Sequence, residues 1–396
     1  MRWSQGVLAS ILLLALGGCV RQPSQFSPAP GLGEDSLDFS VILIGDAGGP
    51  PSADAVLRAV EEDVKTLKDK SVIVFLGDNI YPRGLPAPEA VDYQDALSRI
   101  NRQVKLLTSA DVKGIFVPGN HDWDRSGPDG FGAVRREALA VEESGGEHVE
   151  FLPPNGCPGP EVREFGSFRL VLLDTEWLLR DAEKGRDGCT ATSDSAVRAQ
   201  LETALAGANG KHVVVAAHHP LRSGGEHGGY FRVRDHLFPL RAVKSWLWLP
   251  LPVIGSTYPL ARSGGASPQD ISHSRNRSMR VLLEGALRRY RPLVYAAGHE
   301  HAMQVMAGNS ARWLLVSGVG YFGHGGYVTW LDSTRYATSA SGYMRLDATR
   351  SGNVRLAVMT VDLEGKSTEA YSLWLTPGAR NEECTEPSQE RCSRRR

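Results

Sequence analysis

The chain has 396 residues, of which 41% are hydrophobic and 22% charged, so it has the composition of a globular protein with one large domain or two ordinary ones. Its formal net charge is −1. Because binding of a nucleic-acid backbone requires an excess of basic residues, we expect no nucleic-acid partner.

The N-terminus has the pattern of an export segment. Arg2 precedes a short apolar stretch, Val7 to Leu16, which is far below the roughly 20 residues that span a bilayer. The following residues, Leu16-Gly17-Gly18-Cys19, resemble the bacterial lipobox. The resemblance implies that residues 1–18 are removed as a lipoprotein signal peptide and that Cys19 is acylated. The alternative is an ordinary signal peptide with a chance cysteine. Val20 then favours the outer membrane, because a retention signal for the inner membrane would place Asp there.

Composition divides the remaining chain into three parts. Residues 19–38 are rich in Pro, Ser, Gly and Gln and predict a flexible tether. Residues 39–376 contain neither an internal repeat nor a linker, so we expect one catalytic domain there. Residues 377–396 form a C-terminal tail.

Four cysteines follow the export segment, and their even number suggests disulfides in an oxidising compartment, with three possible connectivities. We favour Cys157–Cys189 and Cys384–Cys392 because each pairing closes the shorter loop. A metal site built from thiolates is the alternative, but no Cys-x-x-Cys spacing supports it.

Short β-branched runs alternate with helical patterns along the first part of the domain, which predicts a parallel sheet with right-handed crossovers. The strands are expected at 39–45, 72–77 and 114–118, with helices at about 53–69 and 88–108. Later strands are expected at 168–173, 212–217, 292–297 and 312–317, and antiparallel hairpins beyond about 340.

Potential metal ligands follow five of these strands. They are Asp46, Asp78, Asn120, His218, and the pair His299 and His301. Because ligands of an open α/β sheet bind outside the carboxyl ends of its strands, solvated loops alone do not explain this pattern. The i, i+2 spacing of the last two histidines suits a metal clamp.

Each block is weak by itself, since a Gly-Asp-Ala-Gly segment can be a simple turn. Together, five blocks resemble the signature of the calcineurin-like metallophosphoesterases, and specifically their purple acid phosphatase branch. They are Asp46-Ala47-Gly48, Gly77-Asp78-Asn79-Ile80-Tyr81, Gly119-Asn120-His121-Asp122, His218-His219-Pro220 and Gly298-His299-Glu300-His301. The resemblance implies an α/β fold of four layers, in which two mixed β-sheets pack together and are flanked by helices.

One pair of substitutions separates that branch from its relatives. The wider family usually has Asp-x-His in its first block, whereas this chain has Gly48 at the histidine position and gains Tyr81. A phenolate makes the first site harder and more negative than an imidazole would, which favours Fe(III) there. The second site would then take Fe, Zn or Mn as a divalent ion.

Carried over position by position, the resemblance implies the following ligands. Asp46, Tyr81 and His301 hold the first metal, Asp78 bridges both metals, and Asn120, His218 and His299 complete the second site. His218 is chosen over His219 because the family motif is His-x-Pro.

The implied reaction is hydrolysis of small-molecule phosphate monoesters by attack of a metal-bound hydroxide. His121 is expected to protonate the leaving oxygen or to hold a phosphate oxygen, with Asp122 orienting its ring. His227, in a Glu-His-Gly segment that resembles one in mammalian-type purple acid phosphatases, is the second catalytic candidate, and a surface loop histidine is the alternative.

Other functions remain open from sequence alone. A phosphodiesterase, nucleotidase or pyrophosphatase would use the same ligands, while a metal-binding surface lipoprotein or an adhesion module would need no catalytic histidine. The apolar stretch 246–251 is either a lid or membrane-contacting loop or a buried irregular segment. The natural substrate and the oligomeric state are not fixed by the sequence.

Overall fold

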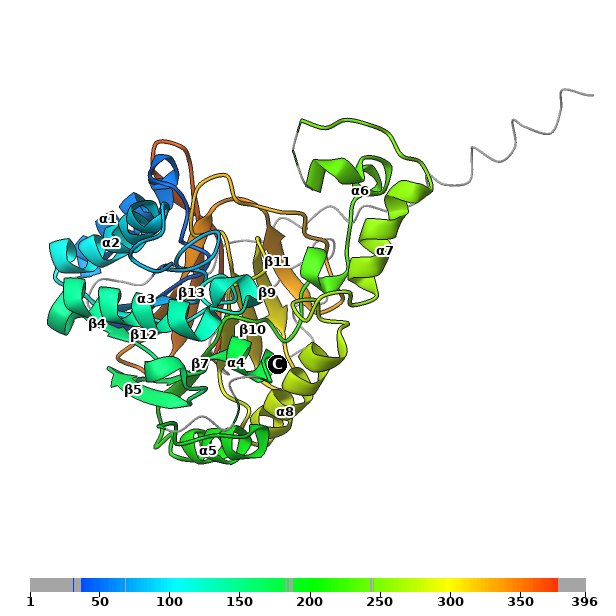
Figure 1. Ribbon diagram of the computed structural model, residues 1–396. Coiled ribbons are helices and arrows are strands. Elements are labelled where there is room, and N and C mark those ends of the chain that lie inside the picture. Colours follow the sequence, from blue (N-terminus) through cyan, green and yellow to red (C-terminus); the bar gives the residue numbers. More distant parts are fainter. Residues whose placement is uncertain are drawn as a thin grey trace, which may run out of the picture.

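Two seven-stranded mixed β-sheets form the centre of the molecule (Figure 1). The structure is a computed structural model, and it describes residue 31 and residues 37–376, apart from 68, 182–183, 185–187, 243 and 245. The predicted export segment, nearly all of the tether and the Cys384–Cys392 pairing lie outside the described residues.

The first sheet has the strand order β14-β13-β12-β1-β2-β3-β4. Strands β1 to β4 run parallel to one another, and β12 joins β1 in antiparallel fashion and leads into the hairpins of β13 and β14. Their bounds are β1 Leu37–Ile44, β2 Ser71–Phe75, β3 Lys113–Phe116, β4 Val149–Phe151, β12 Gly342–Thr349, β13 Val354–Val361 and β14 Ser367–Trp374.

The second sheet has the order β11-β9-β10-β8-β7-β6-β5. Its central strands β6, β7, β8 and β10 are parallel, and antiparallel strands close both edges. Their bounds are β5 Glu161–Phe165, β6 Phe168–Leu172, β7 His212–Ala216, β8 Val294–Ala297, β9 Met303–Ala307, β10 Trp313–Ser317 and β11 Thr334–Thr338.

The strands are apolar on both faces, because each sheet is covered twice. Along β1, Val41 and Leu43 belong to the core between the two sheets, whereas Ile42 and Ile44 belong to the core under the outer helices. This alternation follows from the period of two along a strand. The sequence resemblance therefore predicted the layers correctly.

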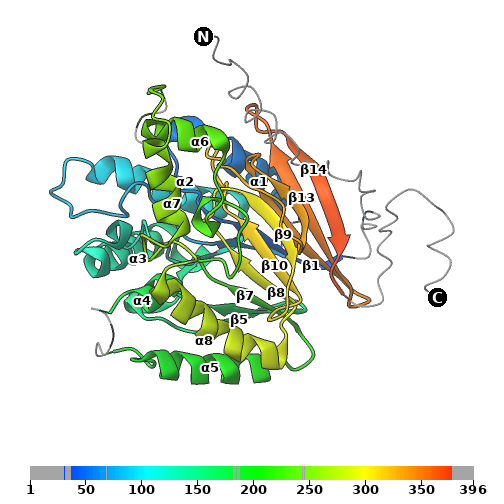
Figure 2. The ribbon, with the colours of Figure 1, turned by 90° about the vertical axis from the view of Figure 1, so that its right-hand side faces the viewer.

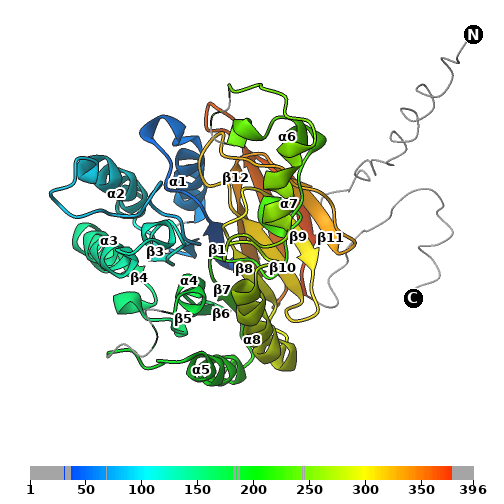
Figure 3. The ribbon, with the colours of Figure 1, turned by 45° about the vertical axis from the view of Figure 1, so that its right-hand side comes forward.

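Helices cover the outer faces of both sheets (Figures 1 and 3). Those over the first sheet are α1 Ala55–Leu67, α2 Tyr93–Ala110 and α3 Gly130–Gly145, and those over the second are α5 Asp194–Ala206 and α8 Ser274–Tyr290. The short helix α4, Thr175–Leu179, begins at Asp174, whose carboxylate accepts a hydrogen bond from the Trp177 amide at 3.0 Å.

Most of the predicted elements are confirmed within a few residues, including the antiparallel hairpins beyond residue 340. The predicted Cys157–Cys189 disulfide is also present. Sequence analysis missed the short or edge strands β4, β5, β9 and β11. β5 and β11 lie at the edges of the second sheet, and β4, with three residues, lies at an edge of the first. Edge strands gain their stability from pairing with one neighbour, so their sequences carry a weaker signal than the buried parallel strands. β9 is an inner antiparallel strand.

An excursion between β7 and α8 projects from the body of the fold (Figures 1 and 2). It contains α6 Val233–Leu237 and α7 Thr257–Ser263 together with the short 3-10 helices η6 Glu226–Gly228, η7 Pro239–Ala242 and η8 Ile254–Ser256. Among the described residues, no helix has both the length and the apolar character that crossing a bilayer requires.

Candidate metal centre

Six of the predicted ligands follow the carboxyl ends of parallel strands. Asp46, Asp78 and Asn120 come after β1, β2 and β3 of the first sheet. His218 follows β7 of the second sheet, and His299 and His301 follow β8. Because the two sheets pack face to face, these ends converge from both sides on one place.

Three of these residues adopt a left-handed backbone conformation, with φ of 58° at Asp46, 56° at Asp78 and 67° at His299. Such angles are uncommon for residues other than glycine. They turn the chain sharply after each strand. Three strained residues at one place are typical of a functional site.

The phenol of Tyr81 joins the first group of ligands. Its oxygen donates to Asp46 Oδ1 at 2.8 Å and lies 3.1 Å from Asp78 Oδ2. The ring nitrogen Nε2 of His301 lies 3.4 Å from the phenol oxygen and 3.7 Å from Asp46 Oδ1. The four residues predicted for the first metal site therefore converge.

The second group consists of Asn120, His218 and His299. Asn120 Oδ1 lies 3.0 Å from His218 Nε2 and 3.0 Å from His299 Nδ1, and the two ring nitrogens lie 3.2 Å apart. The other nitrogen of each ring faces a backbone carbonyl, Leu76 O at 2.8 Å and Gln269 O at 3.1 Å.

This arrangement tests whether a cation fits. A carbonyl accepts only, so each imidazole carries its proton on the nitrogen that faces the carbonyl. His218 Nε2 and His299 Nδ1 then present lone pairs toward the amide oxygen of Asn120. Three lone pairs then face one another with no proton between them. A bound cation would relieve this repulsion.

The carboxylate of Asp78 lies between the two groups. Its Oδ1 lies 3.4 Å from His218 Nε2, on the side of the second group, whereas its Oδ2 faces Tyr81 in the first. One oxygen toward each group is the geometry of a bridging ligand.

Buried negative charge dominates the electrostatics of the first group. Burial, and then the charge of Asp78, raises the pKa of the Asp46 carboxyl well above its usual range. Burial also raises the pKa of the Tyr81 phenol, and the charges of Asp46 and Asp78 raise it further. Burying carboxylates this close together costs free energy unless a cation balances their charge.

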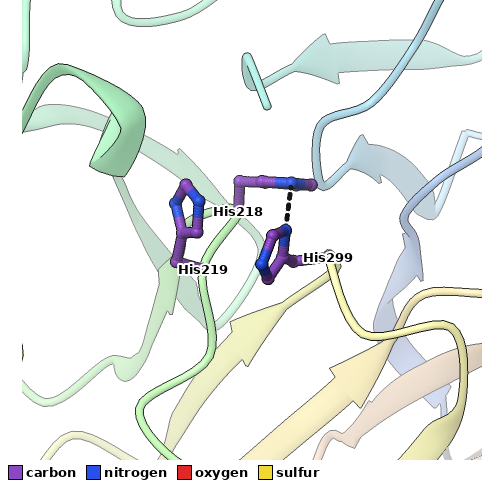
Figure 4. A group of neighbouring side chains, drawn as sticks. All are labelled: His218, His219 and His299. Atoms are coloured by element: carbon purple, nitrogen blue, oxygen red, sulfur yellow. Dashed lines mark hydrogen bonds between the residues drawn. The ribbon is translucent and has the colours of Figure 1, made fainter. Parts of the chain in front are cut away.

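His219 lies near the second group but belongs to a different network (Figure 4). Figure 4 shows His218 and His299 facing one another, with His219 beside them. Both nitrogens of His219 have partners, the Thr175 hydroxyl at 2.8 Å and Gln269 Oε1 at 2.6 Å. Burial lowers its pKa to about 3. The geometry therefore favours His218 as the ligand and His219 as its packed neighbour.

His324 is a residue that sequence analysis missed. Its Nε2 lies 3.2 Å from the Tyr81 phenol oxygen, and its ring lies against that of His301 at a tilt of 41°, with centroids 3.7 Å apart. Tyr321 holds the other nitrogen through its hydroxyl. His324 lies in the glycine-rich loop that follows β10, within the run Gly-His-Gly-Gly at 323–326, and no strand end marks it in the sequence.

The role expected for Asp122 is wrong. Instead of orienting His121, its carboxylate accepts hydrogen bonds from the backbone amides of Gly119, Asn79 and Ile80 at 2.7, 2.9 and 3.1 Å. Asp122 thus ties the third sequence block to the second. The His121 ring is oriented by a backbone carbonyl, because its Nδ1 lies 2.6 Å from Pro82 O.

Glu300, between the last two histidine ligands, organises the loop before α6. Its Oε2 accepts from the Ser223 hydroxyl at 2.7 Å and from the His227 amide at 3.1 Å, and its Oε1 accepts from the Glu226 amide at 3.1 Å. Through these bonds, the block that carries His299 and His301 also fixes the segment that carries His227.

A cavity of about 680 Å³ opens above the two groups of ligands. His121 and His227 both line it, together with Arg125, Tyr258 and Arg262. The two predicted catalytic histidines therefore face the same space as the predicted ligands.

Arg262 was not predicted from sequence, yet it holds His227 in place. Its Nε donates to both oxygens of Asp270, at 2.8 and 2.9 Å, and its Nη2 lies 2.6 Å from Asp270 Oδ1. Its Nη2 also donates to His227 Nδ1 at 3.0 Å. Asp270 Oδ1 lies 3.4 Å from the same nitrogen. Because a guanidinium only donates, the bond from Arg262 requires that Nδ1 accepts and that the proton of a neutral His227 ring lies on Nε2.

A family model of the calcineurin-like phosphoesterases matches residues 39–303, two thirds of the chain and all five sequence blocks. The chain belongs to this family. It is accordingly a metallophosphoesterase, a hydrolase that acts on phosphoric ester bonds, and its family depends on two metal ions. No curated protein matches the chain in a sequence comparison.

Solved structures share the fold at low identity. GAP50, the anchor in the inner membrane complex of Plasmodium, is 14% identical with a TM-score of 0.50, over 86% of this chain and 89% of its own. A purple acid phosphatase from yellow lupin (Lupinus luteus) seeds is also 14% identical with a TM-score of 0.50, over 87% of this chain and 55% of its own. The present chain thus spans about half of the lupin enzyme. A dimetal phosphatase from Danio rerio is 14% identical with a TM-score of 0.46, over 86% and 99%.

Proposed function

We propose that the chain is a dinuclear acid phosphatase of the purple type, which hydrolyses phosphate monoesters with Fe(III) in its first site and a divalent Fe, Zn or Mn in its second. The observation that carries the proposal concerns Gly48, at the position where the wider family has a histidine ligand. A Cβ atom there would lie 2.5–2.6 Å from the backbone of Asn79 and Ile80, so no side chain fits. The Tyr81 phenol lies beside Asp46 and Asp78 instead.

The chemistry of the first group supports a trivalent ion. Because burial and neighbouring charge raise the pKa of Tyr81, a phenolate would form there only beside a strongly charged cation. Asp46, Tyr81 and His301 would hold that ion, Asn120, His218 and His299 would hold the second, and Asp78 would bridge them. When bound, two such ions neutralise phosphoryl charge and lower the pKa of a water molecule.

The chain's own histidines would bind the substrate and move the proton. His121 presents Nε2 to the cavity side because its Nδ1 is engaged by Pro82 O. His227 carries its proton on Nε2, held there by Arg262. The Nε2–H of His227 could donate to a phosphate oxygen. The Nδ1 proton of His121 faces Pro82 O, so His121 could donate from Nε2 only as an imidazolium, and the leaving oxygen needs one such proton. Arg125, exposed on the cavity wall, adds a cation that would attract a phosphate dianion.

Replacement of Tyr81 by Phe tests the proposal. We expect the purified protein to contain iron, to absorb broadly in the visible region, and to hydrolyse p-nitrophenyl phosphate in mildly acidic buffer. Tyr81→Phe should remove the visible band, because the band requires a phenolate bound to Fe(III). Absorption spectra with metal analysis measure this.

Tyr321→Phe is the matched control. The Tyr321 ring packs edge-on against Tyr81, with centroids 5.8 Å apart. We expect the loss of the Tyr321 hydroxyl to leave the visible band in place. Colour that survives Tyr81→Phe, or turnover by a colourless zinc or manganese protein, would contradict the purple type. Faster hydrolysis of bis(p-nitrophenyl) phosphate than of the monoester would favour a phosphodiesterase instead.

We also propose that the protein is exported and anchored through an acylated Cys19. The Cys157–Cys189 disulfide supports an oxidising compartment. Mass spectrometry of the chain isolated from membranes should find an acylated N-terminal Cys19, and Cys19→Ser should release the protein into the soluble fraction. An unmodified N-terminus at another residue would contradict the anchor.

A further inference from the structure

Residues 231–263, the part of the excursion after η6, are here named the apolar arm. Many apolar side chains of this arm are exposed to solvent. Helix α6 buries none of its residues. Val233 and Leu237, one turn apart on that helix, are 77% and 39% exposed. Most of the exposed large hydrophobic side chains among the described residues belong to this arm or to its immediate flanks.

The segment between η7 and η8 continues the same surface. Trp246, Trp248 and Leu249 are 71%, 57% and 55% exposed. These exposures exclude the buried irregular segment, which was one of the two alternatives for 246–251. Soluble proteins rarely expose this many large apolar side chains along one segment, and exposed apolar surface of this kind marks a site that binds a partner.

The tip of the arm is held in a strained turn. Val253 has φ 71° and ψ −63°, and the Ile254 amide donates to Pro252 O at 2.9 Å, which defines a γ-turn of the rare type with positive φ. A β-branched residue in this conformation costs free energy. The turn leaves Val253 and Ile254 86% and 69% exposed. Such strain at an exposed apolar tip calls for a partner that receives these side chains.

The charge of the arm indicates which partner. Residues 231–263 contain the basic residues Arg232, Arg234, Arg241, Lys244 and Arg262 and a single acidic residue, Asp235. Arg262 pairs with Asp270 at the cavity wall, so the charge of the arm itself comes from the other four basic residues against one acidic residue. The Arg241 guanidinium lies 3.8 Å from the centre of the Trp248 ring, so a cation and an aromatic side chain share one site. Tryptophan prefers the interface between hydrocarbon and headgroups, and basic residues beside it attract anionic lipids.

We propose that the apolar arm docks onto a lipid bilayer whose surface carries anionic headgroups. Helix α7 of the arm also supplies Tyr258 and Arg262 to the wall of the cavity above the metal centre. Docking therefore sets one rim of that cavity against the membrane surface. This inference goes beyond phosphatase activity and does not depend on it.

Sedimentation with lipid vesicles tests the inference. The full chain carries Cys19→Ser in every sample, so no acyl chain contributes and all samples share one N-terminus. The vesicles are phosphatidylcholine alone or an equal mixture of phosphatidylcholine and phosphatidylglycerol. We expect the parent chain to bind the mixed vesicles more tightly than the neutral ones.

Two variants separate the apolar from the electrostatic contribution. Trp246→Ser with Trp248→Ser should weaken binding to the mixed vesicles by about tenfold or more, since burying one large apolar side chain is worth on the order of a factor of ten. Arg241→Gln with Lys244→Gln should abolish the preference for mixed over neutral vesicles. Val91→Ser with Val281→Ser, exposed apolar residues outside the arm, is the matched control and should bind as the parent does.

Circular dichroism spectra and melting temperatures should be the same in all samples, which shows that the variants fold. Equal vesicle binding by the tryptophan variant and the parent would overturn the inference. So would a parent dimer that becomes monomeric in the tryptophan variant while vesicle binding stays the same, because the arm would then be an interface between copies of the chain.

Discussion

Asp78→Asn is expected to lower kcat/KM for p-nitrophenyl phosphate by about three orders of magnitude or more, because the charge stabilisation lost with a metal pair amounts to several kcal/mol. The Asp78 carboxylate is the one predicted ligand whose two oxygens face both groups, at 3.1 Å from Tyr81 and 3.4 Å from His218. An amide leaves only one oxygen and no charge. Steady-state kinetics with metal analysis measures the loss, and the metal content should fall below two ions per chain.

Metal-dependent stability gives a second readout. A ligand that binds only the folded protein raises its melting temperature, so added metal should raise the Tm of the parent more than that of Asp78→Asn. Asp347→Asn is the matched control, because this carboxylate is also buried but pairs with Ser40 and Arg345 far from the site. It should reduce stability without changing metal content. Full activity of Asp78→Asn would exclude a bridging role.

Gly48→Ala is expected to lower the free energy of unfolding by about 3 kcal/mol or more, at the upper end of the range for overpacked sites. The new methyl group would meet backbone atoms of Asn79 and Ile80, which cannot rotate away. The Gly48 amide also donates to Asp78 O at 3.0 Å, and its carbonyl accepts from the Tyr81 amide at 3.2 Å. Denaturant unfolding of the metal-free protein measures the change.

Gly285→Ala is the control, for which we expect the free energy of unfolding to rise and not to fall. Gly285 lies inside α8, and a methyl group there would have only ordinary contacts, 3.5 Å or more from the Arg198 guanidinium. Alanine is the better helix former, so this variant should gain up to about 1 kcal/mol. A stable Gly48→Ala variant with unchanged metal content would mean that the turn at residues 78–81 yields easily, and the argument from Gly48 for the purple type would fail.

The buried parallel strands could be predicted from sequence because burial on both faces leaves continuous β-branched runs. β2, at residues 71–75, differs by only one or two residues from its predicted span. The arm could not be predicted in the same way. The apolar run at 246–251 has the same sequence pattern whether it lies in a core or at a surface. Whether it is exposed depends on which helices and strands pack over it, and this pattern does not show that.

The residues of the candidate site also differ in whether the sequence could predict them. Residues that follow strands directly, such as Asp46 and His299, were predicted because strand ends converge in any sheet of this type. Arg262 and His324 reach the same cavity from loops, and their positions depend on chain paths that no local pattern encodes. Asp122 was assigned the wrong role because adjacency to His121 in sequence does not determine which way a carboxylate points after a sharp turn.

The division of the ligands between the two sheets bears on the order of folding. Asp46 and His299 are 253 positions apart, yet the backbone amide of His299 donates a hydrogen bond of 2.8 Å to the carboxylate of Asp46. Closing so long a loop is slow and costs entropy that local contacts do not repay. Neither ligand group can therefore be complete in a nascent chain that has formed only strands β1 to β4. Metal capture becomes a late event, and a tightly held metal pair reports that both halves of the chain have assembled.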